Sequence, residues 1–345
     1  MRRPAFWIVA VLCVIGVLVF PARNLVLGVE GVESLPPSAG PVTAQRLAQE
    51  QLGVPEHAPT LVVVRGVNTL GEAEYMQARI EAVSGGQPVT GPASVPPQEW
   101  DLYIRDGYAI FTLTQPAGDN SPRTHQWLNR LRTAHTPDGV TLKVTGEAAI
   151  YQDYLAALTS DFPKILLTVL AGTLVLLGLA FRSVLLPVKA VLMNLLSVGA
   201  AMGVLTWGFQ EGHFASVLDF QPVGFVDATL PVIIFAALFG ISMDYEVFLL
   251  SRVREEWAAG ASNTHAVAVG MERTGQIITS AALILVAVSS TLAFASLTLD
   301  KALGVSFAVA IVVDATLIRL LLVPALMRVF GDVNWWPVRH RPRLE

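Results

Sequence analysis

The chain has 345 residues, of which 53% are hydrophobic and only 14% are charged, and its formal net charge is −4. Ordinary soluble domains contain about 25% charged residues, and a mean hydropathy of +0.56 indicates more apolar surface than one soluble core can hide. The composition therefore excludes a soluble globular, disordered or fibrous protein and indicates a membrane protein. The acidic balance, without a basic stripe, argues against a nucleic-acid partner. The single cysteine, Cys13, excludes an internal disulfide and a cysteine-based metal cluster.

Six apolar stretches are long enough for membrane-spanning helices, each of which needs about 20 mostly apolar residues. They cover residues 6–27, 164–181, 185–207, 228–250, 277–297 and 303–329. The segment between the first two is rich in Glu, Gln, Arg, Pro and Gly, which indicates a soluble insert. The pattern therefore predicts helix one at 1–29, an inserted domain at 30–160, helices two to six at 161–331 and a short tail at 332–345.

The inserted domain alternates strand and helix patterns. Strand runs cover 60–65, 100–105, 108–114 and 140–145, and helical patterns cover 70–83 and 122–135. Asp106-Gly107, between two of the strand runs, is a strong hairpin signal, and Ser121 before Pro122 marks a helix start. The order β-α-β-β-α-β predicts a ferredoxin-like split unit.

Lys and Arg in the short connections predict the orientation, because they are enriched on the cytoplasmic side. The loop at 209–227 has neither, and the turn between helices five and six has only Lys301. We therefore expect both termini in the cytoplasm and residues 30–160 outside a cell (inner or plasma) membrane. A cleaved signal peptide is disfavoured because the first apolar run is long and no A-x-A site follows it. The basic residues on the inner side are Arg2, Arg3, Arg182, Lys189, Arg252, Arg254, Arg273, Arg328, Arg339, Arg341 and Arg343.

Ionisable residues inside the predicted helices need an explanation, because each costs about 2.5–3.5 kcal/mol at the bilayer centre. Asp244, followed by Tyr245, lies in the inner half of helix four. Helical spacing puts Gly240 and Ala237 on the face of Asp244, and small residues there let another helix approach closely. A carboxylate desolvated at such an interface can load a proton from one side and release it to the other. The alternative is an aspartate that hydrogen-bonds a neighbour and fixes helix packing.

Helix six carries a second pair of charges, Asp314 and Arg319. Five residues subtend about 140° on an α-helix, so we expect the two side chains to reach different neighbours. Arg319 either pairs with a buried carboxylate or extends to the lipid headgroups. In helix five, Thr279 and Ser280 either extend a hydrogen-bonded chain or, more readily, bond back to their own helix.

The remaining polar features suggest no further chemistry. Asp219, Asp227 and Glu211 lie in the outer loop, where we expect them to be solvated. No glycine loop of the G-x-x-x-x-G-K type is present, so the sequence offers no such route to ATP as the energy source. Metal-ligand clusters and a nucleophile elbow are also absent from the sequence. We therefore expect a protein that is not an enzyme and holds no cofactor or metal.

Four segments resemble the signature of MmpL-type (MMPL) transporters in the resistance–nodulation–division (RND) superfamily. The plan of one helix, an outer domain and five further helices is similar as well, so the resemblance spans essentially the whole chain. The segments are FGISMDYEVFLLSRVREEW at 239–257, AVAVGMERTGQIITSAALIL at 266–285, VVDATLIRLLLVPALM at 312–327 and NWW at 334–336.

The resemblance implies proton-driven export of lipids or other hydrophobic compounds, with an outer porter domain after the first helix of each of two repeats. Asp244 and Tyr245 would be the Asp-Tyr pair that one repeat contributes to the bundle centre. Asp314 and Arg319 fall on the family's functional Asp and Arg of the last helix. This chain looks like the second repeat alone, which implies a homodimer, a separate chain that supplies the other half, or a truncated remnant. Since an unpartnered buried carboxylate costs several kcal/mol, we expect association.

Two other classes of function remain open. One is a non-transporting membrane sensor or assembly module, similar to the sterol-sensing relatives of this superfamily. The other is an intramembrane aspartyl protease, which also has two intramembrane aspartates and a Pro-Ala-Leu triplet. For the protease the pieces are arranged wrongly, because Asp244 precedes its tyrosine, Asp314 lacks a G-x-G lead-in, and Pro324 lies on the same helix as Asp314.

Overall fold

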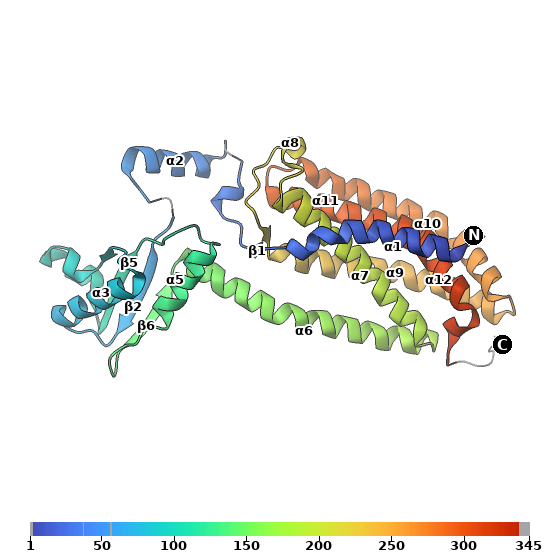
Figure 1. The fold of residues 1–345 in the computed structure, drawn as a ribbon, viewed down its shortest axis with the longest axis horizontal. Helices are drawn as coiled ribbons and strands as arrows, with labels where there is room; N and C mark the ends of the chain where they lie inside the picture. Colours follow the sequence, from blue (N-terminus) through green and yellow to red (C-terminus); the bar gives the residue numbers. More distant parts are fainter. Residues whose placement is uncertain (1–2, 37, 56, 338–345) are drawn as a thin grey trace. The chain divides into compact units, whose positions relative to one another are not determined.

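A computed structural model describes residues 3–36, 38–55 and 57–337, and the chain divides into two compact units. The first comprises Met1–Pro36 and Ser160–Glu345, and we call it the membrane unit. The second comprises Pro37–Thr159, and we call it the inserted unit (Figure 1). The predicted tail lies outside the described residues from position 338 onward, as do four basic residues used for the orientation, namely Arg2, Arg339, Arg341 and Arg343.

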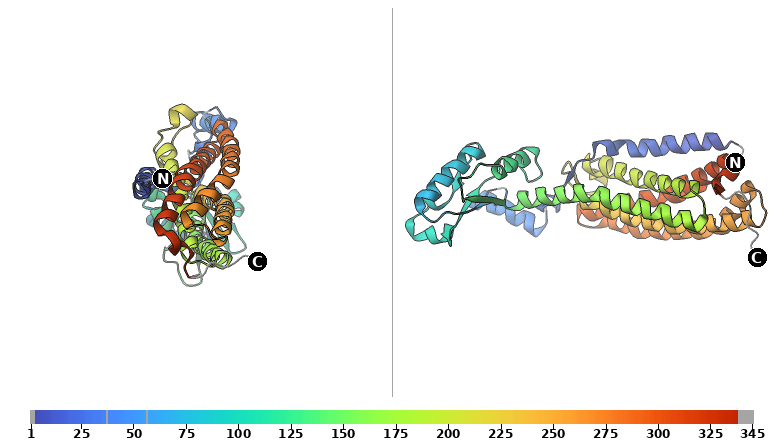
Figure 2. Two further views of the ribbon diagram at one scale, coloured as in Figure 1. Left: turned by 90° about the vertical axis from the view of Figure 1, so that its right-hand side faces the viewer. Right: turned by 90° about the horizontal axis from the view of Figure 1, so that it is seen from below.

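Six helices of the described chain are long and apolar enough to cross a membrane, which confirms the six predicted spans. In Figure 2 the helices of the membrane unit run side by side as a bundle. The last span changes from α-helix to π-helix at Val313–Leu322, which we call the π segment, and returns to α-helix in α12 (Val323–Phe330). The other helices are α1 (Pro4–Val19), α6 (Glu147–Phe181), α7 (Leu185–Val204), α9 (Thr229–Ala258), α10 (Asn263–Thr291) and α11 (Thr298–Val312).

Close packing of α1 against α7 helps to make α7 the most enclosed span. A Cβ atom added to Gly203 of α7 would lie 1.7 Å from the Leu18 carbonyl oxygen, so only glycine allows this approach. Val11 and Ile15 of α1 pack in the same buried cluster as Ala190 of α7. In this way α7 is held in the position from which its polar residues face the bundle interior.

Three sequence expectations about polar residues at the helix ends are wrong. Lys189, expected in the connection between helices two and three, belongs to α7 and is buried. Lys301, expected in the turn between helices five and six, lies in the first turn of α11, where its Nζ donates to the Asp219 carbonyl oxygen. Asp227 is not solvated: it is 5% exposed, and its carboxylate accepts hydrogen bonds from the backbone N–H groups of Glu30 and Thr229. It thereby caps the start of α9, where backbone N–H groups have no helical partner. Asp219 and Glu211 are exposed, as expected.

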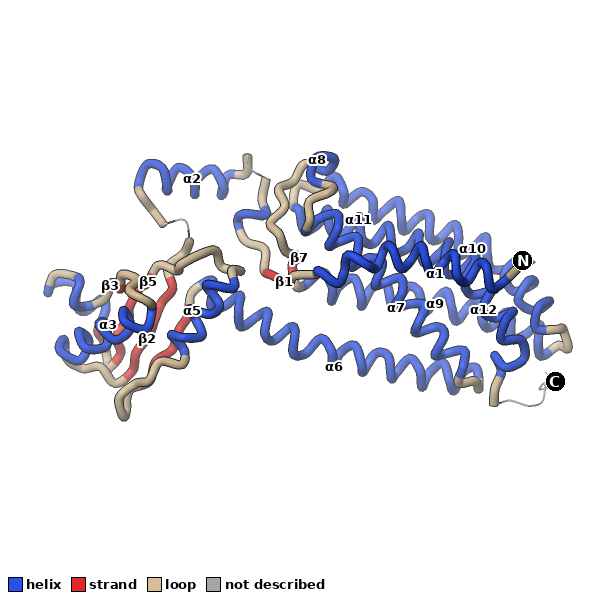
Figure 3. Tube along the Cα trace, in the orientation of Figure 1, coloured by secondary structure: helices blue, strands red, loops and turns tan. Residues whose placement is uncertain are grey.

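The inserted unit contains an antiparallel sheet with the strand order β3-β5-β2-β6 (Figure 3). The expected strand at 100–105 is largely wrong, because residues Trp100–Tyr103 form the short helix α4 and only Ile104–Arg105 (β4) pair with β5. The core of the inserted unit contains the buried residues Val62, Val64, Phe111 and Trp127. The remaining elements are β2 (Thr60–Arg65), β3 (Val89–Thr90), β5 (Tyr108–Leu113), β6 (Thr141–Thr145), α2 (Gly40–Leu52), α3 (Leu70–Ser84) and α5 (Pro122–Arg132).

Local sequence signals explain where these elements begin and turn. Asp106 and Gly107 both have positive φ, 53° and 77°, which is the geometry of the tight hairpin turn that Asp-Gly predicts. At the start of α3, Thr69 and Glu72 form a reciprocal capping box. The backbone N–H groups of Asn68 and Thr69 lower the pKa of Glu72 because they bond its carboxylate.

Candidate functional site

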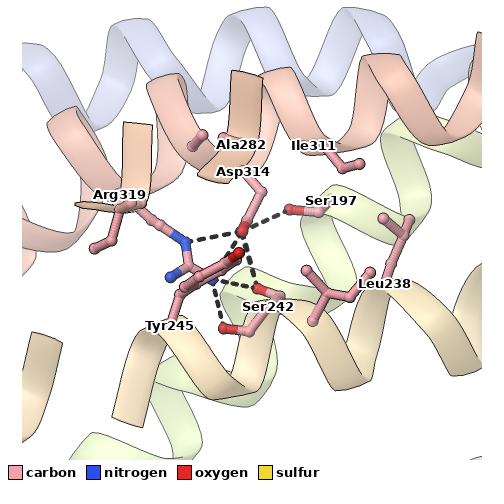
Figure 4. Close-up of a pocket in the computed structure, with 11 residues that line it drawn as sticks. Ser197, Leu238, Ser242, Tyr245, Ala282, Ile311, Asp314 and Arg319 are labelled. Atoms are coloured by element: carbon pink, nitrogen blue, oxygen red, sulfur yellow. Dashed lines mark hydrogen bonds and ion pairs between the residues drawn. The ribbon is translucent and has the colours of Figure 1, made fainter. Parts of the chain in front are cut away.

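A cluster of buried polar side chains joins three helical segments in the interior of the membrane unit (Figure 4). Arg319 and Asp314 come from the π segment, Ser242 comes from α9, and Ser197 comes from α7. All four are at most 9% exposed. A charged pair in this position must satisfy its own hydrogen bonds, because surrounding helices and lipid offer few partners.

Asp314 and Arg319 form a direct ion pair. Arg319 Nε and Nη2 each lie 2.8 Å from Asp314 Oδ2. The expectation that these side chains point to different neighbours is therefore wrong. In a π-helix the hydrogen bonds run from residue i to i+5 instead of i to i+4, so residues five apart come onto one side of the helix. The π geometry of Val313–Leu322 thus creates the pair, and Arg319 is not a headgroup contact.

Hydroxyl groups from the two other helices complete the cluster. Ser242 Oγ donates to the Asp314 carboxylate at 3.1 Å, and Ser197 Oγ lies 3.3 Å from Asp314 Oδ1. Arg319 Nη2 donates to the Ser242 carbonyl oxygen and lies 2.9 Å from its hydroxyl. Because Ser242 contacts both charges, any shift of α9 relative to the π segment must change the surroundings of the ion pair.

The cluster lines a small cavity, and Tyr245 lies on its wall. The cavity volume is about 20 Å³, which is room for about one water molecule. The Arg319 guanidinium carbon lies 5.3 Å from the centre of the Tyr245 ring, a cation–π contact. Arg319 Nη1 is buried without a hydrogen-bond partner in the described structure. The site therefore holds one free donor beside a space large enough for water.

Asp244 does not belong to this cavity. Its side chain is exposed, as is Gly240 one turn earlier, and Ala237 is half-buried. A Cβ added to Gly240 would meet no atom within 4 Å. The expected face of small residues around Asp244 therefore exists, but no helix of the described chain covers it. Burial of Asp244 by a second half remains a prediction.

The hydroxyls of Thr279 and Ser280 on α10 are used locally. Thr279 Oγ1 donates to the Gly275 carbonyl oxygen at 2.7 Å, and Ser280 Oγ donates to that of Ile277 at 3.0 Å. Both residues are exposed. The structure places neither in the polar cluster, in line with the alternative of back-bonding to their own helix.

Sequence reasoning missed Ser242, Glu246 and Lys189 as buried polar residues of the bundle. Glu246 and Lys189 are each 7% exposed. The signal was present, because Glu246 follows Tyr245 in an apolar helix and carries the same insertion cost as Asp244. Lys189 was counted with the inner connection although the predicted third helix includes it.

The arrangement of carboxylates does not resemble a pair of protease aspartates, which share one site. The Asp314 carboxylate is bound by Arg319, Ser242 and Ser197, whereas Asp244 is exposed outside that cavity. Within residues 3–36, 38–55 and 57–337, no group of three or more His, Cys, Asp or Glu side chains could hold a metal ion. The chemistry on offer is proton and hydrogen-bond exchange among carboxylates, hydroxyls and a guanidinium.

Comparison with known proteins finds a match to the MMPL family over residues 34–344. The trehalose monomycolate exporter MmpL3 of Mycobacterium tuberculosis (strain ATCC 25618 / H37Rv) is 34% identical, over 100% of this chain and 37% of that protein. The mycolic acid-containing lipids exporter MmpL11 of Mycolicibacterium smegmatis (strain ATCC 700084 / mc(2)155) is 35% identical, over 97% of this chain and 35% of that protein. A heme uptake protein MmpL11 of Mycobacterium tuberculosis (strain ATCC 25618 / H37Rv) is also 35% identical.

The chain spans about a third of the length of the curated relatives it matches, 37% in the case of MmpL3. The family match covers most of the chain, including the cluster residues Ser197, Ser242, Asp314 and Arg319. Together with the six helices that can cross a membrane, it makes the chain a multi-pass membrane protein. The chain belongs to the MMPL family.

Proposed function

We propose that this chain is one half of an exporter that moves a lipid or another hydrophobic compound across the cell membrane, driven by the proton-motive force. The names of the relatives, which include exporters of trehalose monomycolate and of mycolic acid-containing lipids, support a lipid substrate. The inserted unit would act as the extracytoplasmic porter domain, and both termini would be cytoplasmic. Its strand order β3-β5-β2-β6 supports a ferredoxin-like plan.

The observation that carries the proposal is the uncovered face of α9. Asp244 is exposed there beside Gly240, in a helix apolar enough to cross a membrane. Charged residues in membrane helices almost always face the bundle interior or a water-filled cavity, so this face needs a cover. A second half, supplied by a second copy or by another chain, would pack on the small residues and enclose Asp244.

Enclosed in this way, Asp244 would load and release the driving proton. Ser242 and Tyr245 lie on the same helix as Asp244, and both contact Arg319. If protonation of Asp244 moves α9, that movement therefore changes the contacts of the buried ion pair. One elementary charge that crosses 100 mV supplies about 2.3 kcal/mol, which shifts an equilibrium between two helix packings by more than tenfold. In this account Thr279 and Ser280 have no part in the relay.

Transport in inside-out membrane vesicles that contain the chain tests the proposal. With an imposed proton-motive force, translocation of a fluorescent phospholipid analogue should require the chain and should stop when an uncoupler is added. Asp244→Asn should reduce this flux at least about tenfold, because a barrier raised by about 1.4 kcal/mol slows a step by that factor. Asp219→Asn, at an exposed loop position, is the matched control and should transport as the parent does. Equal flux in Asp244→Asn and the parent would remove the proton-carrier role.

A further inference from the structure

The chain that leaves α1 stays attached to the membrane unit before it enters the inserted unit. We call residues 25–36 the lead-in, because the inserted unit begins at Pro37. The beginning of the lead-in is held by Gln210, the last residue of the span that starts with α7. The Val26 backbone N–H donates to Gln210 Oε1 at 2.9 Å, and Gln210 Nε2 donates to the Asn24 carbonyl oxygen at 2.9 Å. The lead-in therefore starts from a fixed point.

The next residues of the lead-in pair as a strand with the residues before α9. β1 (Leu27–Gly28) runs parallel to β7 (Val226–Asp227), and Figure 3 shows the two side by side. The Ala228 backbone N–H donates to the Gly28 carbonyl oxygen at 2.9 Å. A Cβ added to Gly28 would lie 2.5 Å from Phe225 Cδ2, so glycine allows this close approach. The lead-in is thus joined directly to the start of α9.

Asp227 fastens this junction with its two carboxylate oxygens. Oδ1 accepts hydrogen bonds from the backbone N–H and the hydroxyl group of Thr229, the first residue of α9. Oδ2 accepts a hydrogen bond from the Glu30 backbone N–H at 3.0 Å. Asp227 is 5% exposed, and hydrogen bonds to a charged acceptor are about twice as strong as neutral ones. One buried side chain therefore holds both α9 and the lead-in.

Thr298 attaches the lead-in a second time, four residues further along. Its Oγ1 donates to the Ser34 carbonyl oxygen at 3.1 Å. Thr298 is 8% exposed and is the first residue of α11, which continues directly into the π segment. Residues 30–34 therefore bridge the starts of two spans. These two spans also share the buried polar cluster, since Ser242 of α9 contacts both charges of the π segment.

The bridge between the two attachments has little slack. Val32–Ser34 forms a 3-10 turn, in which the Ser34 backbone N–H donates to the Gly31 carbonyl oxygen at 3.2 Å. Ser34 Oγ donates to the same oxygen at 2.8 Å. Only Leu35 and Pro36 separate Ser34 from the first residue of the inserted unit. A displacement between the attachments therefore cannot be absorbed by a loose loop.

We propose that Asp227 and Thr298 are positioning residues that pass a movement of α9 relative to the π segment on to the inserted unit. The inference rests on the proposed function, because that function supplies the movement. When the two spans shift against each other, the separation of Glu30 from Ser34 changes. The turn between them must follow, and it carries the entry into the inserted unit with it.

Substitutions can cut each attachment by itself. Asp227→Asn keeps the start of α9, because asparagine is as favourable there as aspartate and its amide oxygen can accept from Thr229. The amide nitrogen is a donor and cannot accept from the Glu30 N–H, so the lead-in is released. Thr298→Val removes the bond to Ser34 with little change in shape. Thr229→Val is the matched control, because it removes only the hydroxyl bond to Asp227.

A nitroxide spin label on the lead-in tests the attachments in the full chain, reconstituted in nanodiscs. Cys13→Ala removes the single cysteine, and Val32→Cys places the label at a residue that is 36% exposed. We expect a larger mobile fraction in Asp227→Asn and in Thr298→Val than in the parent and in Thr229→Val. A label at Val17→Cys, on α1 and 74% exposed, should give one spectrum in all four proteins. An unchanged label at position 32 in Asp227→Asn and Thr298→Val would overturn the inference.

Inside-out vesicles test whether the attachments couple proton flow to lipid movement. Proton flow is followed with a pH-sensitive dye inside the vesicles, and lipid flux is followed as above. Asp227→Asn should still pass protons but lose most of the lipid flux, so that more protons flow per lipid moved. A chain that is merely destabilised would lose both. Thr298→Val should show the same change, and it serves if Asp227→Asn does not fold.

A disulfide can replace the lost attachment. Leu27 and Val226 are paired across the two strands, and neighbouring strands lie within the Cα spacing that a disulfide needs. In the Cys13→Ala, Asp227→Asn background, Leu27→Cys with Val226→Cys should regain lipid flux when an added oxidant joins the two thiols. A reductant should remove the flux again.

The outcomes separate this inference from the transport proposal. Equal lipid flux in Asp227→Asn and the parent would contradict the inference and leave the transport proposal standing. A disulfide that forms without regain of lipid flux would contradict it in the same way. A parent without uncoupler-sensitive flux would overturn the transport proposal, and this inference with it.

Discussion

Two aspartates of the membrane unit have opposite surroundings. Asp314 is 9% exposed and is bound by Arg319, Ser242 and Ser197 from three helical segments. Asp244 is exposed on α9, one turn after Gly240, where an added Cβ atom would meet no other atom within 4 Å. The chain therefore satisfies one intramembrane carboxylate by itself and leaves the other without cover. This difference separates a buried ion pair from an exposed carboxylate that, in the function proposed above, a second half would cover.

The largest expected effect comes from breaking the buried pair. Arg319→Met leaves Asp314 as an unpaired charge in the interior, which costs about 3–5 kcal/mol. The free energy of unfolding, followed by circular dichroism in detergent, should fall by that amount. The double variant Asp314→Leu with Arg319→Met removes both charges and should recover most of the loss. A single variant as stable as the parent would show that the pair does not hold the helices together.

One substitution placed at two glycines compares a covered face with the uncovered one. Gly203→Leu must push α1 away from α7, because even its Cβ would lie 1.7 Å from the Leu18 carbonyl oxygen. We expect a loss of about 1–3 kcal/mol or more in the free energy of unfolding. Gly240→Leu should leave the single chain at least as stable, because leucine favours a helix over glycine by up to about 1 kcal/mol.

The same Gly240→Leu change should weaken association with a second half, because a bulky side chain then occupies the face that the partner would need. Size-exclusion chromatography of the detergent-held chain measures this loss. Unchanged association would place the partner on another face of the bundle.

The smallest effect is expected at the hydroxyls that the structure leaves out of the cluster. Thr279 Oγ1 is bonded to its own helix and its residue is exposed. Thr279→Ala should change the free energy of unfolding by no more than about 0.5 kcal/mol, and the uncoupler-sensitive flux should remain. A clear loss of flux in this variant, with unchanged stability, would restore Thr279 to the proton path.

The sequence predicts what depends on composition and on local signals. Six spans follow from apolar runs of about 20 residues, and the Asp106-Gly107 turn follows from the positive φ values that these residues tolerate. The strand expected at 100–105 fails because β propensity is decided largely by neighbours in the sheet. There Trp100–Tyr103 forms a helix instead.

The candidate site depends on geometry that a sequence pattern does not contain. Helical spacing of 3.6 residues per turn separates Asp314 from Arg319, and only the π segment brings them together. Spacing did place Gly240 and Ala237 beside Asp244, but it could not show that this face is left open.

The central claim is that a second half covers the α9 face that carries Asp244. The most direct test is the native mass of the chain extracted from its membrane in nanodiscs. The account predicts a particle that contains this 37.0 kDa chain together with a second copy or another chain. In Gly240→Leu the second copy or other chain should be absent from the particle. A particle that contains a single chain, extracted from vesicles that show uncoupler-sensitive transport, would contradict the account.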